Sequence, residues 1–191
     1  MTSAKNCWNC KATIKSNDFF CNKCNKIQKP LDLDEFEVFG IKKVFLIDLN
    51  SLEDSYLKLQ TKLHPDRFVN STEKEREFSN HHSSKINESY KLLINNVTRA
   101  NIILKSNGYD IEKESRTFGD DKMLEEIMDL QSECMLAETE NSKKKIGDEI
   151  KKKIDQTIQK LDVLFKKKSW KDAYKQNVKL SYLEKMKKNL S

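Results

Sequence analysis

Four cysteines stand in two closely spaced pairs near the start of the chain, as Cys7-x2-Cys10 and Cys21-x2-Cys24. Two such pairs can form two turns that converge four thiolates on one tetrahedral zinc ion. Because four thiolate ligands leave no coordination position open for a substrate, the spacing predicts a structural zinc site rather than a catalytic one.

The segment that carries these cysteines is too short to bury a core, since few apolar residues accompany Trp8 and Phe19. A bound zinc ion would supply most of its folding free energy, on the order of 10 kcal/mol. Two disulfides are an alternative, but they require an oxidising compartment. Iron–sulfur ligation is also conceivable, although paired short spacings favour zinc. Cys134 lies far away in the sequence, and we expect it to be a buried apolar residue of a helix.

A second group of candidate functional residues is the tripeptide His64-Pro65-Asp66. Proline disfavours helical geometry at the preceding residue, so His64 should end a helix and Asp66 should present a free carboxylate in a loop. Lys58 and Lys62 lie four residues apart on the helix before this turn and predict a basic surface beside the exposed acid. Taken alone, the tripeptide is equally compatible with an ordinary turn.

Two amphipathic stripes predict the helices that position this turn. Leu52, Tyr56, Leu59 and Leu63 form the stripe before it, and Ile86, Tyr90, Leu93 and Val97 form the stripe after it. Such stripes predict two helices that pack antiparallel, with a polar loop over about residues 66–74. The helical region should end near Asn107-Gly108, because glycine readily adopts the left-handed conformation that terminates helices.

The rest of the chain predicts long helices and little else. One stripe runs for five turns through Ile146, Ile150, Ile154, Ile158, Leu161 and Phe165, and a further helix should open near Trp170. Triple lysines around this stripe are typical of a solvated helix face, although a basic binding face is the alternative. With 4 glycines and 2 prolines in 191 residues, the expected class is all-α.

Composition and motifs also exclude several functions. The net charge of +6 is small against 36 basic and 30 acidic residues, so it does not by itself indicate a nucleic-acid partner. No apolar run is long enough for a membrane span, and no signal peptide or presequence is visible. His81 and His82 have no catalytic partner in a motif, and no phosphate-binding glycine loop occurs, so we do not expect an enzyme.

Taken together, the motifs resemble those of the HscB/Jac family of iron–sulfur cluster co-chaperones, which carry a J-domain. The resemblance covers essentially the whole chain. It rests on the cysteine pairs, the His64-Pro65-Asp66-Arg67-Phe68 turn, Ile86-Asn87-Glu88-Ser89-Tyr90, Arg99-Ala100, Leu104 and Asn107-Gly108-Tyr109. It implies a zinc-binding module at 1–30, a J-domain at 34–110 and a C-terminal three-helix bundle at 118–191.

The resemblance implies an adaptor that contacts two proteins. His64, Pro65 and Asp66, supported by Lys58, Lys62 and Arg67, would stimulate the ATPase of a DnaK-type chaperone. The C-terminal domain would deliver an IscU-type scaffold protein to that chaperone. The implied compartment is the mitochondrial matrix, with the cytoplasm also open, and neither nucleic acid nor a membrane is an expected partner.

The scaffold-binding residues carry over less securely. Leu124, Met128 and Tyr182 match the apolar patch of the family, and the acidic residues Glu125, Glu126, Asp129 and Glu133 are kept on the same helix. Met123 and Ser132 leave the register open, since a shift of one residue would rename the patch. From periodicity alone, all three patch residues could equally be bundle core.

Two other functions remain open at this stage. A zinc-ribbon protein with a lysine-rich helical tail could bind nucleic acid, but that function does not explain the His64-Pro65-Asp66 turn. A general J-domain co-chaperone with another client would keep this turn and use other apolar segments of the tail. Salt-dependent nucleic-acid binding would favour the first alternative, and failure to bind an IscU-type scaffold would favour the second.

Overall fold

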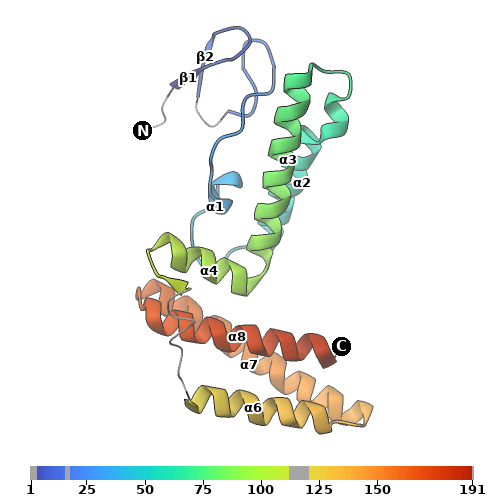
Figure 1. The fold of residues 1–191 in the computed structure, drawn as a ribbon, viewed down its shortest axis with the longest axis vertical. Helices are drawn as coiled ribbons and strands as arrows, with labels where there is room; N and C mark the ends of the chain where they lie inside the picture. The colour runs from blue at the N-terminus through green and yellow to red at the C-terminus, as the bar shows by residue number, and fades with distance from the viewer. Residues whose placement is uncertain (1–3, 16–17, 112–120, 191) are drawn as a thin grey trace. The chain divides into compact units, whose positions relative to one another are not determined.

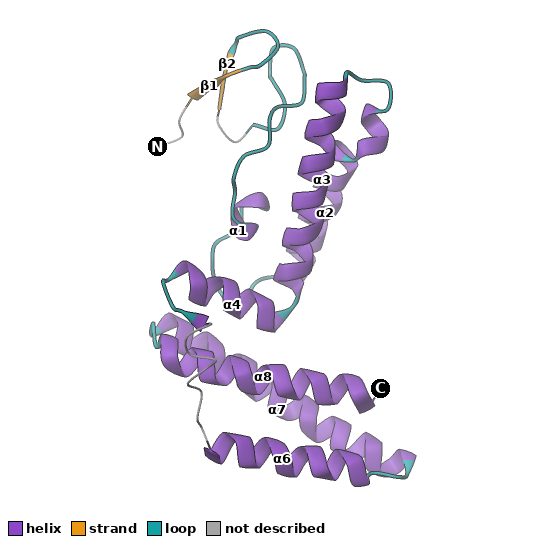
Figure 2. Cartoon of the chain, viewed as in Figure 1, coloured by secondary structure: helices purple, strands orange, loops and turns teal. Residues whose placement is uncertain are grey.

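The computed structural model describes residues 4–15, 18–111 and 121–190. Contacts divide the chain into two compact units, one of residues 1–42 and 47–94 and the other of residues 43–46 and 95–191. Seven α-helices lie in the described residues, and the only described strands are a short pair near the N-terminus (Figures 1 and 2). The predicted helical fold with a small N-terminal module is confirmed.

The first unit begins with the four-cysteine module and continues into a helical hairpin. Strands β1 (Ala4–Asn6) and β2 (Thr13–Lys15) pair antiparallel in the module. The short helix α1 (Glu35–Val38) follows, and then α2 (Leu49–Leu63), the 3-10 turn η1 (Pro65–Phe68) and α3 (Glu73–Ile94). Helices α2 and α3 pack against each other as the hairpin.

The two stripes predicted from sequence form the core of this hairpin. Leu52, Leu63, Ile86 and Leu93 are fully buried or nearly so. Tyr56 and Tyr90 stack with their ring centroids 4.2 Å apart, and the Tyr56 hydroxyl donates a hydrogen bond to Asn87 Oδ1 over 3.0 Å. Leu63 at the end of α2 accepts a hydrogen bond from Ser79 near the start of α3, whereas Tyr56, earlier on α2, meets Tyr90 near the end of α3, so the two helices are antiparallel, as predicted.

The second stripe is shorter than predicted, because α3 ends at Ile94. Asn95 adopts an extended conformation, and its side chain accepts a hydrogen bond from the Thr98 amide over 2.9 Å. This N-cap starts a separate helix, α4 (Asn96–Ser106). The prediction that Val97 continues the stripe of α3 is therefore wrong, since Val97 lies on α4.

Helix α4 ends where the sequence predicts. Gly108 has a φ of +76°, and the Tyr109 amide donates to the Leu104 carbonyl over 3.1 Å. This left-handed glycine satisfies carbonyls that the helix end would leave unpaired. By its contacts α4 belongs to the second unit. The limits 34–110 for a J-domain stay a prediction, and the start of the tail domain at Phe118 lies outside the described residues.

The second unit is a helical bundle organised around α8 (Trp170–Leu190), which opens at the residue predicted from sequence. Helix α8 packs against α4, α6 (Asp121–Leu136) and α7 (Glu140–Lys166). Ile150, Leu161, Leu180 and Leu183 are almost completely buried in it. The long stripe of α7 is confirmed by the burial of its central and C-terminal members.

A four-residue segment from the N-terminal half completes this bundle. Phe45 is buried, and its ring lies 5.2 Å from that of Phe165 on α7. Arg99 Nε donates to the Phe45 carbonyl over 2.7 Å, and the Arg99 guanidinium lies over the Phe45 ring. Burial lowers the pKa of Arg99 to about 10, and Glu184 partly opposes this shift. Residues 43–46 are therefore a structural part of the second unit.

Candidate functional site

Each cysteine pair sits in a tight turn that aims its thiols inward. In the first turn the Cys7 amide donates to the Ala12 carbonyl, and the Lys11 amide donates to the Cys7 carbonyl. In the second turn the Asn25 amide donates to the Cys21 carbonyl in the same way. Lys11 and Asn25 adopt left-handed backbone conformations, with φ of 62° and 55°. The two turns thus share one geometry, which brings their thiols to a common centre.

The positions of the sulfurs fit a metal ion. All four Sγ atoms lie within 4.8 Å of one another, with 3.7 Å between Cys7 and Cys24 and 3.6 Å between Cys10 and Cys21. A tetrahedron with zinc–sulfur bonds of about 2.3 Å places its sulfurs about 3.8 Å apart. Disulfide sulfurs lie about 2.0 Å apart, and these cysteines are free thiols. The four cysteines can therefore hold a metal ion, as their spacing predicts.

The surroundings of Cys7 favour its anionic form. Burial alone would raise the pKa of this thiol, but hydrogen bonds from the Cys10 and Asn9 amides and from neighbouring thiols lower it to about 6. The buried Gln28 amide also donates to Cys7 Sγ over 3.4 Å. The backbone bond to Ala12 lowers the pKa of Cys10, but burial and the bonds with the other three thiols outweigh it and raise that pKa to about 11. Cys7 is therefore the thiol of this cluster that most readily forms the thiolate, which is the form that binds metals.

The His64-Pro65-Asp66 turn lies at the end of the hairpin. His64 caps the C-terminus of α2 in an extended conformation, and Pro65 opens the 3-10 turn η1. The Asp66 amide donates to His64 Nδ1 over 3.3 Å. The side chain of Asp66 is 87% exposed and that of His64 is about half exposed. The predicted helix end and the exposed carboxylate are both confirmed.

Three basic residues accompany this turn on the surface. Lys58, Lys62 and Arg67 are all exposed. Arg67 Nη1 donates to the Thr61 carbonyl over 3.1 Å, which holds its guanidinium against the last turn of α2. The turn and the face of α2 that leads to it therefore form one exposed surface of mixed charge, which we call the HPD surface.

The base of the turn is anchored by a buried hydroxyl. Ser79 is completely buried, and its Oγ donates to the Leu63 carbonyl over 2.7 Å.

Replacing Ser79 by alanine leaves this carbonyl unpaired, so we expect a loss of about 1–2 kcal/mol in the free energy of unfolding. Urea unfolding would measure it. Ser84→Ala, at an exposed position of the same helix, is the matched control and should change little; equal losses in the two variants would contradict the assignment.

Two of the three predicted patch residues share a face of α6. Leu124 is half-buried and Met128 is 66% exposed, so neither belongs to the core that Met123, Ile127 and Leu130 form. Met135 continues the exposed face seven residues further, at 76% exposure. An apolar strip of this kind is unusual on a polar helix. We call Leu124, Met128 and Met135 the α6 strip.

The structure places Tyr182 beside a different helix. It is 41% exposed and lines a shallow groove, whose other walls include Val97 and Thr98 of α4 and the N-cap residue Asn95. Its assignment to one patch with Leu124 and Met128 stays a prediction, because this groove is lined by residues of α4 and α8 and by none of α6.

An ion-pair network in the bundle was not predictable from the sequence. Glu126 accepts hydrogen bonds from Lys153 on α7 and Lys179 on α8, and bonds to Lys179 and Lys153 lower the pKa of its carboxyl against the effect of burial. Lys166 likewise pairs with Asp162. Paired lysines of this kind fit the interpretation of the lysine runs as the polar flank of a core helix.

Comparison with known proteins identifies the family. A model described as the HSCB C-terminal oligomerisation domain matches residues 119–191. The iron–sulfur cluster co-chaperone HscB homolog of Arabidopsis thaliana is 35% identical over 184 residues, which cover 95% of this chain and 71% of the relative. The human co-chaperone HscB is 29% identical over 92% of this chain and 77% of its own length.

Relatives from plants, animals and bacteria share this similarity. The crystal structure of human HscB superimposes with a TM-score of 0.88 at 27% identity, covering 97% of this chain and 96% of that chain. Among the residues described, none of the helices combines the length and apolarity needed to cross a membrane. From its sequence similarity along nearly its whole length and its shared fold, this chain belongs to the HscB family of iron–sulfur cluster co-chaperones, whose members are not enzymes.

Proposed function

We propose that this co-chaperone stimulates the ATPase of a DnaK-type chaperone through the HPD surface and delivers an IscU-type scaffold to it through the C-terminal bundle. The observation that carries the proposal is the exposed His64-Pro65-Asp66 turn at the end of the hairpin that α2 and α3 form. The Ser79 bond to Leu63 and the burial of Phe68 fix the two sides of this turn. A partner therefore meets a preorganised loop, which reduces the entropy lost on binding.

Charge supports the first contact. Lys58, Lys62 and Arg67 present cations that would steer an acidic surface of the chaperone toward the turn. The exposed Asp66 carboxylate then offers acceptors to a donor on the chaperone. Steering raises the association rate and weakens with salt, whereas the turn itself sets which protein is activated.

The α6 strip supports the second contact. Exposed apolar side chains on an otherwise polar helix are typical of a small binding hot spot. Glu125, Asp129 and Glu133 are exposed around it and would attract a basic rim on the scaffold. Glu126 is already bonded to two lysines of the bundle and serves the fold instead.

The test of the proposal is steady-state ATP hydrolysis by a DnaK-type chaperone from a cognate iron–sulfur system, with this protein and an IscU-type scaffold added singly and together. We expect this protein to stimulate hydrolysis and the scaffold to add to the stimulation. Stimulation without a scaffold effect would identify a J-domain co-chaperone with another client. No stimulation at all would refute the proposal.

Truncating two side chains of the α6 strip should weaken the binding of the scaffold and leave the contact with the chaperone unchanged. We expect Leu124→Ala combined with Met128→Ala to weaken scaffold binding by about 30-fold or more, the loss typical of hot-spot residues. Stimulation of the chaperone alone should stay at the wild-type level. Calorimetric titration measures the affinity, and Val163→Ala, an exposed apolar position on α7, is the control. Tyr182→Ala tests the third predicted residue separately. Unchanged affinity in the double variant would move the scaffold site elsewhere.

We further propose zinc as the metal of the four-cysteine module and the mitochondrial matrix as the compartment. Four thiolates at tetrahedral spacing suit zinc, which would fold the module without taking part in a reaction. The compartment rests on the resemblance to eukaryotic members of the family. Metal analysis of the purified protein and microscopy of the tagged protein in its own cells test the two proposals.

A further inference from the structure

The four-cysteine module packs onto the first turns of α3, within the same compact unit. Trp8, in the first cysteine turn, meets Phe78 edge to face with ring centroids 6.1 Å apart. Lys26 lies two residues after Cys24, and its Nζ lies 3.0 Å from Oε2 of Glu75. Both cysteine turns thus have a residue anchored on α3.

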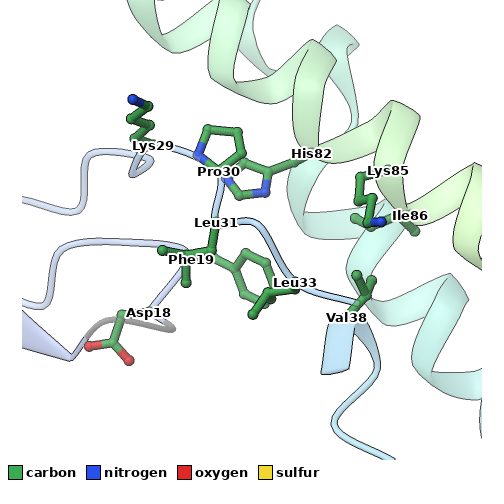
Figure 3. Close-up of a pocket in the computed structure, with 10 residues that line it drawn as sticks. All are labelled: Asp18, Phe19, Lys29, Pro30, Leu31, Leu33, Val38, His82, Lys85 and Ile86. Carbon is green, nitrogen blue, oxygen red and sulfur yellow. The ribbon is translucent and has the colours of Figure 1, made fainter. Parts of the chain in front are cut away.

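Further contacts extend this interface along α3. Lys74 Nζ lies 4.7 Å from the centre of the Trp8 ring. His82 Nε2 is 2.9 Å from the Gln28 carbonyl, and the ring of His82 meets that of Phe19 edge to face. Figure 3 shows Phe19 and His82 around a cavity of about 30 Å³, which has room for little more than one water molecule. The module is therefore closely packed against the helix.

The contact with the largest structural consequence is that of Lys26, because its partner Glu75 lies in the first turn of α3 and exchanges hydrogen bonds with Thr72, the residue just before the helix. Glu75 Oε2 accepts three hydrogen bonds, from Lys26 Nζ over 3.0 Å, from Thr72 Oγ1 over 2.8 Å and from the Thr72 amide over 3.2 Å. Thr72 and Glu75 form the reciprocal N-terminal cap of the helix. Burial alone would raise the pKa of Glu75, but the bonds from Lys26 and Thr72 outweigh it and keep the pKa below its usual value.

This cap closes the segment that contains the HPD turn. The segment leaves α2 at His64, where Ser79 holds the preceding carbonyl, and it enters α3 at Thr72. Between these points Phe68 is buried and the Ser71 amide donates to the Phe68 carbonyl over 2.9 Å. One end of the segment is held by the hairpin itself, and the Glu75 carboxylate at the other end accepts a hydrogen bond from a lysine of the four-cysteine module.

We propose that Lys26 and Glu75 are positioning residues for the HPD turn, through which the metal-binding module holds the first turn of α3 and thereby the loop that meets the chaperone. Ligation of Cys21 and Cys24 fixes the second cysteine turn, and the Lys26 carbonyl accepts the Cys21 amide over 2.9 Å. The position of Lys26 therefore depends directly on that turn. The inference rests on the proposed chaperone contact for its functional part only.

The test compares Lys26→Met with Lys23→Met, which removes an exposed charge from the same turn. In Lys26→Met we expect the amides of Thr72 and Glu75 to exchange with solvent about tenfold faster, the loss typical of a hydrogen bond to a charged group. The chaperone's ATPase should need several-fold more co-chaperone for half-maximal stimulation at an unchanged maximal rate, because a smaller fraction of molecules holds the competent loop. Lys26→Arg should restore both values, and the zinc content should equal that of wild type.

The outcomes distinguish a failure of this inference from a failure of the proposed chaperone contact. Unchanged exchange at Thr72 and Glu75 in Lys26→Met would overturn the inference, as would equal effects in Lys23→Met. Faster exchange with unchanged half-maximal stimulation would also overturn it, since the cap would then not position the loop. If wild type fails to stimulate the chaperone, the proposed function fails, while the exchange data still decide whether Lys26 holds the cap.

Discussion

Replacing His64 by glutamine is expected to abolish stimulation of the chaperone's ATPase while leaving the fold intact. The His64 ring is exposed, and its Nδ1 accepts the hydrogen bond that orders Asp66 in the turn. Glutamine allows the extended backbone conformation that ends α2, but it has no ring nitrogen to accept the hydrogen bond from the Asp66 amide. Because the turn is the centre of the proposed contact, we expect stimulation at a fixed protein concentration to fall about 30-fold or more.

The measurement is steady-state hydrolysis across a range of co-chaperone concentrations, with circular dichroism and thermal unfolding on the same samples. His81→Gln is the matched control, since His81 is an exposed histidine on α3. Asp66→Asn should lose stimulation as His64→Gln does, because it removes the exposed carboxylate without changing its size. Wild-type stimulation by either turn variant would show that the turn is only a helix connection.

Losing one cysteine ligand should unfold the whole N-terminal module. We expect Cys24→Ser to lose stoichiometric zinc, because three thiolates and a hydroxyl no longer complete the site. Structural zinc contributes on the order of 10 kcal/mol to modules of this size, far more than their small apolar core can replace. The amides of Cys7 and Cys21, each now bonded inside its turn, should then lose their protection from exchange.

Metal analysis and amide exchange on the purified variants measure these effects. Cys134→Ser is the control, because Cys134 lies on α6 and its removal should leave the zinc content unchanged. Cys24→Ser protein that keeps one zinc per chain would refute the assigned ligand set. Helix content should fall little in Cys24→Ser, since the module contributes only short strands.

The features that the sequence predicted well are those set by local spacing. Two residues between cysteines suit a metal-binding turn, and proline after His64 disfavours helical geometry at that histidine, so each signal lies within a few residues of the feature that it predicts. The long stripe of α7 and the glycine stop at Gly108 are equally local. For such features a short window of sequence contains the residues that determine the local backbone conformation.

The features that it missed depend on side chains that meet from distant segments. Leu93 and Val97 lie four residues apart and fit one helical stripe, and only the hydrogen bond that the Thr98 amide donates to Asn95 Oδ1 reveals that a new helix starts between them. Tyr182 could be assigned to any face of its helix until α4 was seen beside it. The Lys26 bond to Glu75 joins residues far apart in the chain, so no local pattern could indicate it.

The place of Phe45 in the second unit also constrains the order in which the chain can fold during synthesis. Residues of the first unit leave the ribosome early, and all of them are available once Ile94 has emerged. Phe45 emerges with them but must wait for Phe165, which is made more than half a chain later. Because domains generally form as their residues appear, this aromatic ring stays uncovered through much of translation. The nascent co-chaperone therefore presents an apolar segment of the kind that chaperones bind.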